Sequence, residues 1–367
     1  MKILIVSLLR RPVNNKITAA RPRMIYELVR KLVEKGHEVS ILGTGDSEVE
    51  GAKIVPVIPR SFMELQAFEN PFYAEVAYLS KMAKMLEEMS GEYDIVHNHT
   101  FPEFINLLVE KNLKCPMVTT IHAQMTPEMD DALSHFKESN LVCISNSAKD
   151  LAKNSQILKV VYNGIDTSLF KYEKEKQDYL LWIGRLSKAR DKDGNFLDPK
   201  GVKWAIKLAK ETGSKLKFFG NVEDIEFFDK EVKPNLNDDI QFVAPVSKEQ
   251  PLGKEDVVKY MQGAKAFLMT VNWAEPFGLV MAEAMSCGTP VIGFDNGSVP
   301  ELVEDGKTGY VVKYGEGIDG LKAALGKIDS IKTEDCRERV EKLFSIDAMV
   351  DNYENIYQDL VKEFGEE

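Results

Sequence analysis

The sequence predicts two α/β domains, each a doubly wound parallel sheet of the Rossmann type. Short apolar runs of strand length alternate with helix-length segments in both halves of the chain, as expected for parallel strands connected by helices. The 367 residues also exceed the usual size of a single hydrophobic core. Because the two halves are similar in size, we expect two Rossmann-like domains facing each other across a cleft.

The first domain is expected over residues 1–170 and opens with a βαβ unit. A buried strand at 3–6 is followed by a long loop, a helix at 21–35 and a strand at 39–42. Ser147 is expected to cap a later helix. The other expected elements are strands at 54–57, 93–97, 117–122, 141–145 and 160–166, and a helix at 73–89.

The second domain is expected over residues 171–345, after a charged linker at 171–178. Its expected strands are 179–184, 215–220, 240–242, 266–269 and 291–294. A final amphipathic stretch at 346–364 predicts a helix within a separate C-terminal segment, residues 346–367.

Composition and charge exclude several classes of protein. Hydrophobic residues make up 44% of the chain, and no apolar run approaches the ~18 residues of a membrane span. The chain opens directly into a strand, so we expect no signal peptide, and four scattered cysteines fit a reducing cytoplasm. The net charge of −11 argues against a general nucleic-acid binder. Residues 1–31 are basic, which indicates a solvated face, an anion site or weak contact with acidic lipid.

The most informative segment is residues 273–285, which contains two carboxylates. A Pro-Phe-Gly turn follows Glu275, and Glu283 lies in the apolar helical run behind it. The pattern places a helix N-terminus just after Glu275, and its unpaired backbone N–H groups attract phosphate. Glu283 would lie about 9 Å along the axis from Phe277, which suits gripping an extended ligand better than flanking one glycosidic bond. The alternative is a local pairing of Glu283 and a surface-turn role for Glu275.

This segment resembles the donor-binding E-x7-E motif of retaining glycosyltransferases of family four, which have the GT-B fold. Further matches lie at residues 288–292, 300–303 and 309–312, and the resemblance covers nearly the whole chain. It implies transfer of a sugar from a nucleotide-diphosphate donor to an acceptor hydroxyl, with retained anomeric configuration and no metal or other cofactor. It also implies that the first domain binds the acceptor, the second binds the nucleotide-sugar, and the last helix crosses back onto the first domain.

Two basic residues stand at strand ends, where open α/β sheets bind ligands. Arg185 follows Gly184 at the end of an expected strand, and Lys200 precedes a helix. A departing diphosphate needs positive charge that is in place before the bond breaks. The alternative is that both side chains are ordinary surface residues. The resemblance implies that both contact the donor phosphates.

The segment between these two residues is longer than is usual in the family. This insert, residues 187–199, contains Lys188 and Lys192, which are alternatives to Lys200 as the phosphate contact. Its Asp191-to-Asn195 stretch is similar to a metal-binding loop, but the further ligands and closing Glu of a calcium loop are absent. We therefore expect no metal site.

Three histidines, His97, His99 and His122, lie near the ends of expected strands. They could be ordinary polar loop residues, and a close-spaced zinc ligand set is lacking. The resemblance implies that His122 lies close to the donor sugar. It also implies a hinge turn at Asn163 and Gly164, where the glycine would allow a positive φ, and a donor contact from Asn163.

The first loop departs from the family, which often has Gly-Gly there. The chain has residues 12–20 instead, so Lys16, Arg21 and Arg23 are candidates, together with His97, for an acceptor or anion site.

The resemblance implies distinct roles within the donor site. Glu283 would bind the ribose hydroxyls, and Glu275 would hold the sugar hydroxyls. The backbone N–H groups expected to hold sugar hydroxyls and phosphate are those of Phe277, Gly278 and Leu279.

Two other functions remain open. A GT-B sugar-nucleotide epimerase would need further acid and base residues, for which His97 and Asp94 are the only hints. A non-catalytic nucleotide-sugar binding protein would bind without turnover. The sequence leaves the acceptor open between a lipid, a polysaccharide, another sugar and a small metabolite. We expect a cytoplasmic protein with at most peripheral contact at the inner membrane face.

Overall fold

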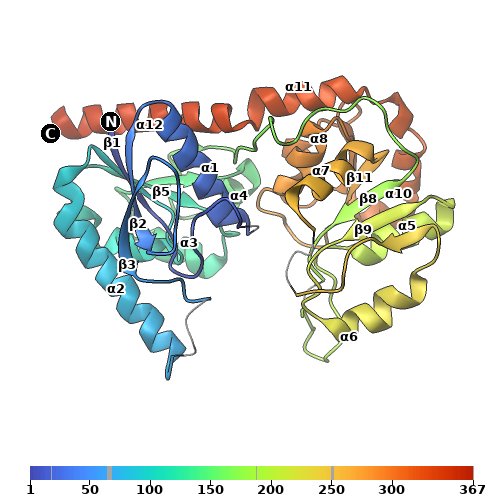
Figure 1. The fold of residues 1–367 in the computed structure, drawn as a ribbon, viewed down its shortest axis with the longest axis horizontal. Coiled ribbons are helices and arrows are strands. Elements are labelled where there is room, and N and C mark those ends of the chain that lie inside the picture. Colours follow the sequence, from blue (N-terminus) through green and yellow to red (C-terminus); the bar gives the residue numbers. More distant parts are fainter. Residues whose placement is uncertain (18, 64–67, 187, 249–251, 367) are drawn as a thin grey trace. The chain divides into compact units, whose positions relative to one another are not determined.

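The computed structural model describes all residues except 18, 64–67, 187, 249–251 and 367 (Figure 1). Thr18 in the first loop and Ser187 in the insert therefore lie outside the described residues. The chain divides into two compact units, one of residues 1–165 with 345–367 and the other of residues 166–344. Each unit is an α/β domain, which confirms the predicted fold class.

The first unit is built on a seven-stranded parallel sheet. Its strand order, β3-β2-β1-β4-β5-β6-β7, is that of a doubly wound fold. The central strands are almost entirely buried because helices cover both faces of the sheet. The strands are β1 (Lys2–Val6), β2 (Glu38–Thr44), β3 (Lys53–Ile58), β4 (Ile95–Asn98), β5 (Met117–Ile121), β6 (Asn140–Cys143) and β7 (Lys159–Val160).

The long helices of the first unit each bury an apolar face. The predicted long helix appears as α2, which buries Leu79, Met82 and Leu86. The expectation that Ser147 caps a helix is wrong, because the hydroxyl of Ser145 accepts the N–H of Ala148 instead. The α-helices are α1 (Ala20–Glu34), α2 (Pro71–Met89), α3 (Pro127–Leu133), α4 (Asn146–Leu151) and α12 (Ile346–Glu366), with 3-10 segments η1 (Ser90–Glu92) and η2 (Glu103–Asn112).

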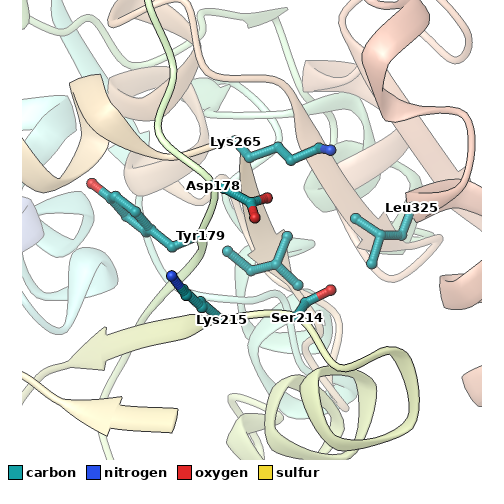
Figure 2. Close-up of a pocket in the computed structure, with 7 residues that line it drawn as sticks. Asp178, Tyr179, Ser214, Lys215, Lys265 and Leu325 are labelled. Carbon is teal, nitrogen blue, oxygen red and sulfur yellow. The ribbon is translucent and has the colours of Figure 1, made fainter. Parts of the chain in front are cut away.

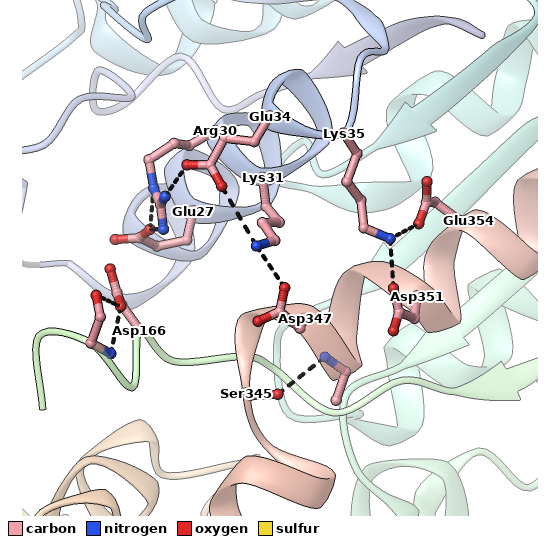
Figure 3. Close-up of polar contacts among 12 residues, drawn as sticks. Glu27, Arg30, Lys31, Glu34, Lys35, Asp166, Ser345, Asp347, Asp351 and Glu354 are labelled. Carbon is pink, nitrogen blue, oxygen red and sulfur yellow. Dashed lines mark hydrogen bonds and ion pairs between the residues drawn. The ribbon is translucent and has the colours of Figure 1, made fainter. Parts of the chain in front are cut away.

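The C-terminal helix α12 packs within the first unit, against α1 (Figures 1 and 3). Its apolar face enters the core that surrounds β1. At the surface, Lys31 of α1 pairs with Asp347 at 2.6 Å, and Lys35 pairs with Asp351 at 2.6 Å and with Glu354 (Figure 3). Charged contacts thus flank a buried apolar contact along both helices.

The second unit contains a six-stranded parallel sheet with the order β10-β9-β8-β11-β12-β13. Both sheets therefore have the same Rossmann-type arrangement, with the first strand of the unit third in the strand order. The strands are β8 (Leu180–Ile183), β9 (Leu216–Phe219), β10 (Ile240–Phe242), β11 (Ala266–Met269), β12 (Val291–Phe294) and β13 (Gly309–Val312).

Helices again connect these strands (Figure 1). The helices are α5 (Val202–Thr212), α6 (Ile225–Phe227), α7 (Lys254–Gly263), α8 (Leu279–Ser286), α9 (Val299–Leu302), α10 (Gly317–Leu325) and α11 (Thr333–Leu343), with a π-helical turn η3 (Phe228–Val232) and 3-10 turns η4 (Lys233–Asn235), η5 (Tyr314–Glu316) and η6 (Ile328–Ser330). No helix in the described part of the chain is long and apolar enough to cross a membrane.

The turn at Gly164 has a different cause from the predicted one. Gly164 is not among the glycines with positive φ. Instead, a Cβ at this position would lie 2.7 Å from Cα of Ile346, because the chain leaving β7 passes directly over the start of α12. Close backbone approach therefore explains the glycine.

Candidate functional site

The second unit brings two predicted site residues together at the carboxyl ends of β8 and β11. Nζ of Lys200 lies 2.6 Å from Oε2 of Glu275, and Nε1 of Trp273 donates to the same oxygen at 3.0 Å. The Lys200 ammonium also lies 4.7 Å from the centre of the Trp273 ring, within the range of a cation–π contact. A carboxylate, an ammonium and an indole thus form one cluster at the sheet edge where α/β proteins bind ligands.

Backbone contacts fix the position of Lys200. The next residue, Gly201, has a φ of +75°, and a Cβ there would lie 1.6 Å from the carbonyl oxygen of Thr270. The Thr270 hydroxyl donates to the Gly201 carbonyl at 2.7 Å. The carboxylate of Asp198 accepts the N–H groups of the first turn of α5. Lys200 is therefore held between the end of β11 and the start of α5.

The loop after β12 supports Glu275 from behind. A Cβ at Gly297 would lie 2.3 Å from the backbone nitrogen and oxygen of Glu275. Ser298 donates its N–H to the Glu275 carbonyl at 2.9 Å and its hydroxyl to the Phe277 carbonyl at 2.8 Å. These contacts leave the Glu275 side chain 11% exposed, beside Lys200.

The helix expected after Glu275 is α8, which begins at Leu279. Gly278 is its N-cap residue with a φ of +77°, and a Cβ there would lie 2.6 Å from the Met281 side chain. Phe277 and Gly278 thus precede the helix rather than forming its first turn. Glu283 lies inside α8 and is 2% exposed, so a ligand would reach its carboxylate only if neighbouring side chains moved.

Arg185 lies in the loop that leaves β8. Its side chain is 59% exposed and pairs with Glu223 at 3.4 Å, so little in the protein restricts it. A Cβ at Gly184 would lie 2.7 Å from the Trp182 ring and 3.3 Å from Cβ of Lys200. Glycine at this position therefore lets Lys200 pack against β8.

The described part of the insert, residues 188–199, contains a folded turn. Asp191 accepts the N–H groups of Asp193 and Asn195. Arg190 pairs with Asp224 at 2.6 Å and stacks on Phe196, with 3.7 Å between the guanidinium carbon and the ring centre. The two lysines of the insert, Lys188 and Lys192, are exposed. Among the described residues, no group of three or more His, Cys, Asp or Glu could hold a metal ion.

In the first unit, His97 is a core residue. Its ring is fully buried, with Nδ1 2.6 Å from the hydroxyl of Tyr357 and Nε2 2.7 Å from that of Thr120. Thr120 in turn contacts the Tyr353 hydroxyl at 2.9 Å. Both ring nitrogens are occupied by contacts to β5 and α12, which argues against the predicted acceptor or anion role of His97.

His122 follows β5 and contacts a histidine that sequence reasoning had not chosen. Nε2 of His122 lies 2.9 Å from Nδ1 of the fully buried His99. Burial and, to a smaller extent, the nearby Arg21 guanidinium together lower the pKa of His99 to about 3, and the same two causes lower the pKa of His122 well below its usual value. Both rings are therefore neutral at physiological pH.

The predicted anion site of the first loop does not form around Arg21. Its guanidinium donates to Glu103 at 2.7 Å and to the Thr100 carbonyl at 3.1 Å, so its charge is already matched. Lys16 is exposed and Arg23 is half-buried. Asn163 is 6% exposed, beside the close approach of Gly164 to α12.

The pocket shown in Figure 2 lies at the amino ends of the strands of the second sheet, whereas Lys200 lies at their carboxyl ends. This pocket of about 70 Å³ is lined at the amino ends of β8, β9 and β11. Its lining residues are Asp178, Tyr179, Leu180, Ser214, Lys215, Lys265 and Leu325, and none is a predicted site residue.

Known proteins resemble both halves of the chain. The family described as "Glycosyl transferases group 1" matches residues 165–342, and "Glycosyltransferase Family 4" matches residues 22–169. The N-acetyl-alpha-D-glucosaminyl L-malate synthase of Bacillus anthracis is 27% identical, over 92% of this chain and 93% of that protein.

Solved structures show the same fold over the whole chain. Sucrose-phosphate synthase from Thermosynechococcus elongatus superposes with a TM-score of 0.77 and 17% identity, covering 99% of both chains. HepE from Anabaena, in complex with UDP and glucose, has a TM-score of 0.71 and 16% identity, covering 98% of this chain and all of the other.

Proposed function

The chain belongs to the family 4 glycosyltransferases and has the GT-B fold, and from that premise we propose that it is a retaining enzyme that transfers a hexosyl group from a nucleoside-diphosphate sugar. The observation that carries the proposal is the cluster of Lys200, Glu275 and Trp273 at the strand ends of the second unit. An ammonium and a carboxylate side by side match a ligand with a charged diphosphate next to a sugar rich in hydroxyls.

In this proposal the donor replaces the ion pair of Lys200 and Glu275. The diphosphate carries more negative charge than a carboxylate, so it takes the Lys200 ammonium, and the exposed Arg185 folds onto it. The Glu275 carboxylate is then available to accept hydrogen bonds from sugar hydroxyls. The N-terminus of α8 adds backbone N–H groups for phosphate, and Glu283 binds the ribose after side-chain rearrangement.

The reaction breaks the bond between the anomeric carbon and the diphosphate oxygen and forms one to the acceptor oxygen on the same face. The acceptor proton passes to the departing phosphate, so no protein base is required. Lys200 and Arg185 stabilise the charge that develops on the leaving group, in place of a metal ion.

The names of related proteins support parts of this proposal. The Bacillus anthracis relative is named for an α-linked N-acetylglucosaminyl product, which is in keeping with retention from an α-linked donor. The Anabaena structure contains UDP and glucose, which supports a uridine nucleotide as the first donor to try. We propose a cytoplasmic enzyme that uses an acceptor hydroxyl of a small molecule, a sugar or a lipid headgroup.

The epimerase alternative is weakened by where its two candidate residues lie. His97 is buried with both nitrogens occupied. Asp94 precedes β4, at the amino end of the strand, and accepts the N–H of Lys2 at 2.7 Å. Neither carries an acid or base to the carboxyl ends of the strands.

A panel of nucleoside-diphosphate sugars tests the proposal. The wild-type protein is incubated with each donor and a mixture of acceptors, and released nucleoside diphosphate is measured beside Glu275→Ala and Arg185→Ala. Release from one donor that is lost in both variants supports a transferase. Conversion of the sugar without release would point to an epimerase, and tight binding with neither would point to a binding protein.

A further inference from the structure

Two neutral histidines share one hydrogen in the first unit. Nδ1 of His99 and Nε2 of His122 lie 2.9 Å apart, so one nitrogen donates and the other accepts. They stand just beyond β4 and β5, which pair directly in the sheet. The contact therefore links His122 to a second, fully buried ring.

The surroundings of the pair keep both rings uncharged. The ring of His97 lies 3.8 Å from that of His99, centre to centre, and is itself neutral because burial lowers its pKa. The charge of the nearby Arg21 is matched by its partner Glu103, with which it pairs at 2.7 Å. A neutral imidazole carries a single N–H, so the shared hydrogen fixes the tautomer of each ring.

The second nitrogen of His99 decides between the two arrangements. Nε2 of His99 is buried and has no hydrogen-bond partner within the described part of the chain. If His122 donated to His99, the His99 proton would sit on Nε2 as a buried N–H without an acceptor. If His99 donates from Nδ1, Nε2 is only an unused lone pair. Orphaned buried N–H groups are the rarer and costlier of the two, so His99 is the donor.

We propose that His99 is a positioning residue that holds His122 as the Nδ1–H tautomer, so that His122 offers a hydrogen-bond donor to an oxygen of a ligand bound beyond the carboxyl ends of β4 and β5. With Nε2 of His122 accepting from His99, the His122 proton must lie on Nδ1. The other tautomer, with its proton on Nε2, would turn the lone pair of Nδ1 toward the same oxygen and repel it. The identity of the ligand depends on the proposed function, whereas the tautomer is a property of the free protein.

The tautomer can be measured directly in the ligand-free, full-length protein. Labelling with ¹⁵N-histidine gives separate nitrogen signals for protonated and unprotonated ring positions. The chain has five histidines, so single substitutions assign the His122 signals. We expect a protonated Nδ1 and an unprotonated Nε2 for His122 at pH 7. A protonated Nε2 would overturn the proposal.

Variants at position 99 separate positioning from folding. His99→Asn keeps a donor where Nδ1 was, whereas His99→Leu removes it, and the exposed His135→Asn is the control. We expect the Asn variant to keep the His122 tautomer and the Leu variant to lose it. With the donor found in the panel, the Leu variant should lower kcat about tenfold, the size of one hydrogen bond, with a smaller change in KM.

Two results would contradict the proposal: an unchanged His122 tautomer in His99→Leu, or equal kcat in His99→Leu and wild type. If His99→Leu does not fold, the wild-type spectrum still decides the tautomer. If no protein in the series shows transfer, the spectra stand and only the proposed function fails.

Discussion

Nζ of Lys200 lies 2.6 Å from Oε2 of Glu275, although 75 residues separate them in the sequence. Both side chains are mostly covered, at 20% and 11% exposure, so the pair is not an ordinary surface ion pair. Three elements hold it in place: the end of β11, the N-cap of α5 and the loop after β12. A pair held in place in this way fits a binding site in which Lys200 and Glu275 exchange their mutual contact for contacts with a charged ligand.

The first prediction concerns the charge of Lys200. Lys200→Met keeps the length of the side chain and removes the charge that would face the diphosphate. We expect kcat/KM for the donor to fall by about 10²- to 10³-fold, as for other lost transition-state contacts. Lys192→Met, in the exposed insert, is the matched control and should keep near-wild-type kinetics. Equal losses in both variants would return the phosphate role to the insert.

The second prediction concerns the indole of Trp273. Trp273→Phe keeps an aromatic ring near Lys200 but removes the hydrogen bond to Glu275. Because this bond is to a charged group, we expect kcat/KM to fall by at least about tenfold. Trp204→Phe loses a comparable bond, to Asn272 at 2.9 Å, and should change kcat/KM much less. Unchanged kinetics in Trp273→Phe would show that Glu275 needs no such orientation.

The third prediction concerns the two glycines that flank α5, Gly201 at its start and Gly213 at its end. Gly201→Ala should lower the free energy of unfolding by about 3 kcal/mol or more, because a Cβ there meets the Thr270 carbonyl in addition to the cost of positive φ. Gly213 has a similar φ of +66° with nothing within 4 Å of a Cβ. Gly213→Ala should therefore cost only about 1 kcal/mol. Chemical unfolding measures both, and equal costs would contradict the close approach.

The fourth prediction concerns Glu110 and pH. Burial raises its pKa to about 7, with Glu138 adding to the effect and a hydrogen bond from Ser139 opposing it. The folded protein then binds more protons than the unfolded chain between about pH 4.5 and 7, so this group lowers stability as pH rises through that window. Glu110→Gln should reduce the loss of unfolding free energy across this pH window by about 1–3 kcal/mol. Thermal unfolding from pH 4.5 to 8 tests this.

A control separates Glu110 from its acidic neighbour. Glu138 is 81% exposed, so Glu138→Gln should leave the pH dependence of unfolding close to that of the wild type. Identical pH profiles in wild type and Glu110→Gln would contradict the raised pKa.

The sequence predicted most of the strands and the long helices α1, α2 and α12, because burial and periodicity act locally, but it did not identify β13 as a strand or α10 and α11 as helices. The apolar runs at β1, β11 and β12, for example, correspond to strands within one residue of the expected bounds. The start of α8 was placed too early, because the left-handed Gly278 interrupts the chain before Leu279. A Cβ at Gly278 would also meet the Met281 side chain at 2.6 Å, a close approach that the sequence pattern does not reveal.

The site was predictable only where a residue type itself carries the chemistry. Lys200 and Glu275 were chosen for their charge and motif, and the structure brings them together. The support from Ser298 and the partnership of His99 with His122 depend on contacts between distant loops. His97 was misjudged because Tyr357, 260 residues further along the chain, covers it.

The most direct test of the account is a crystal structure of the protein with its nucleotide-sugar donor bound. The account predicts that Lys200 leaves Glu275 for a diphosphate oxygen, and that the Glu275 carboxylate accepts from a hydroxyl of the sugar. A donor bound elsewhere, with the Lys200–Glu275 pair intact, would contradict it.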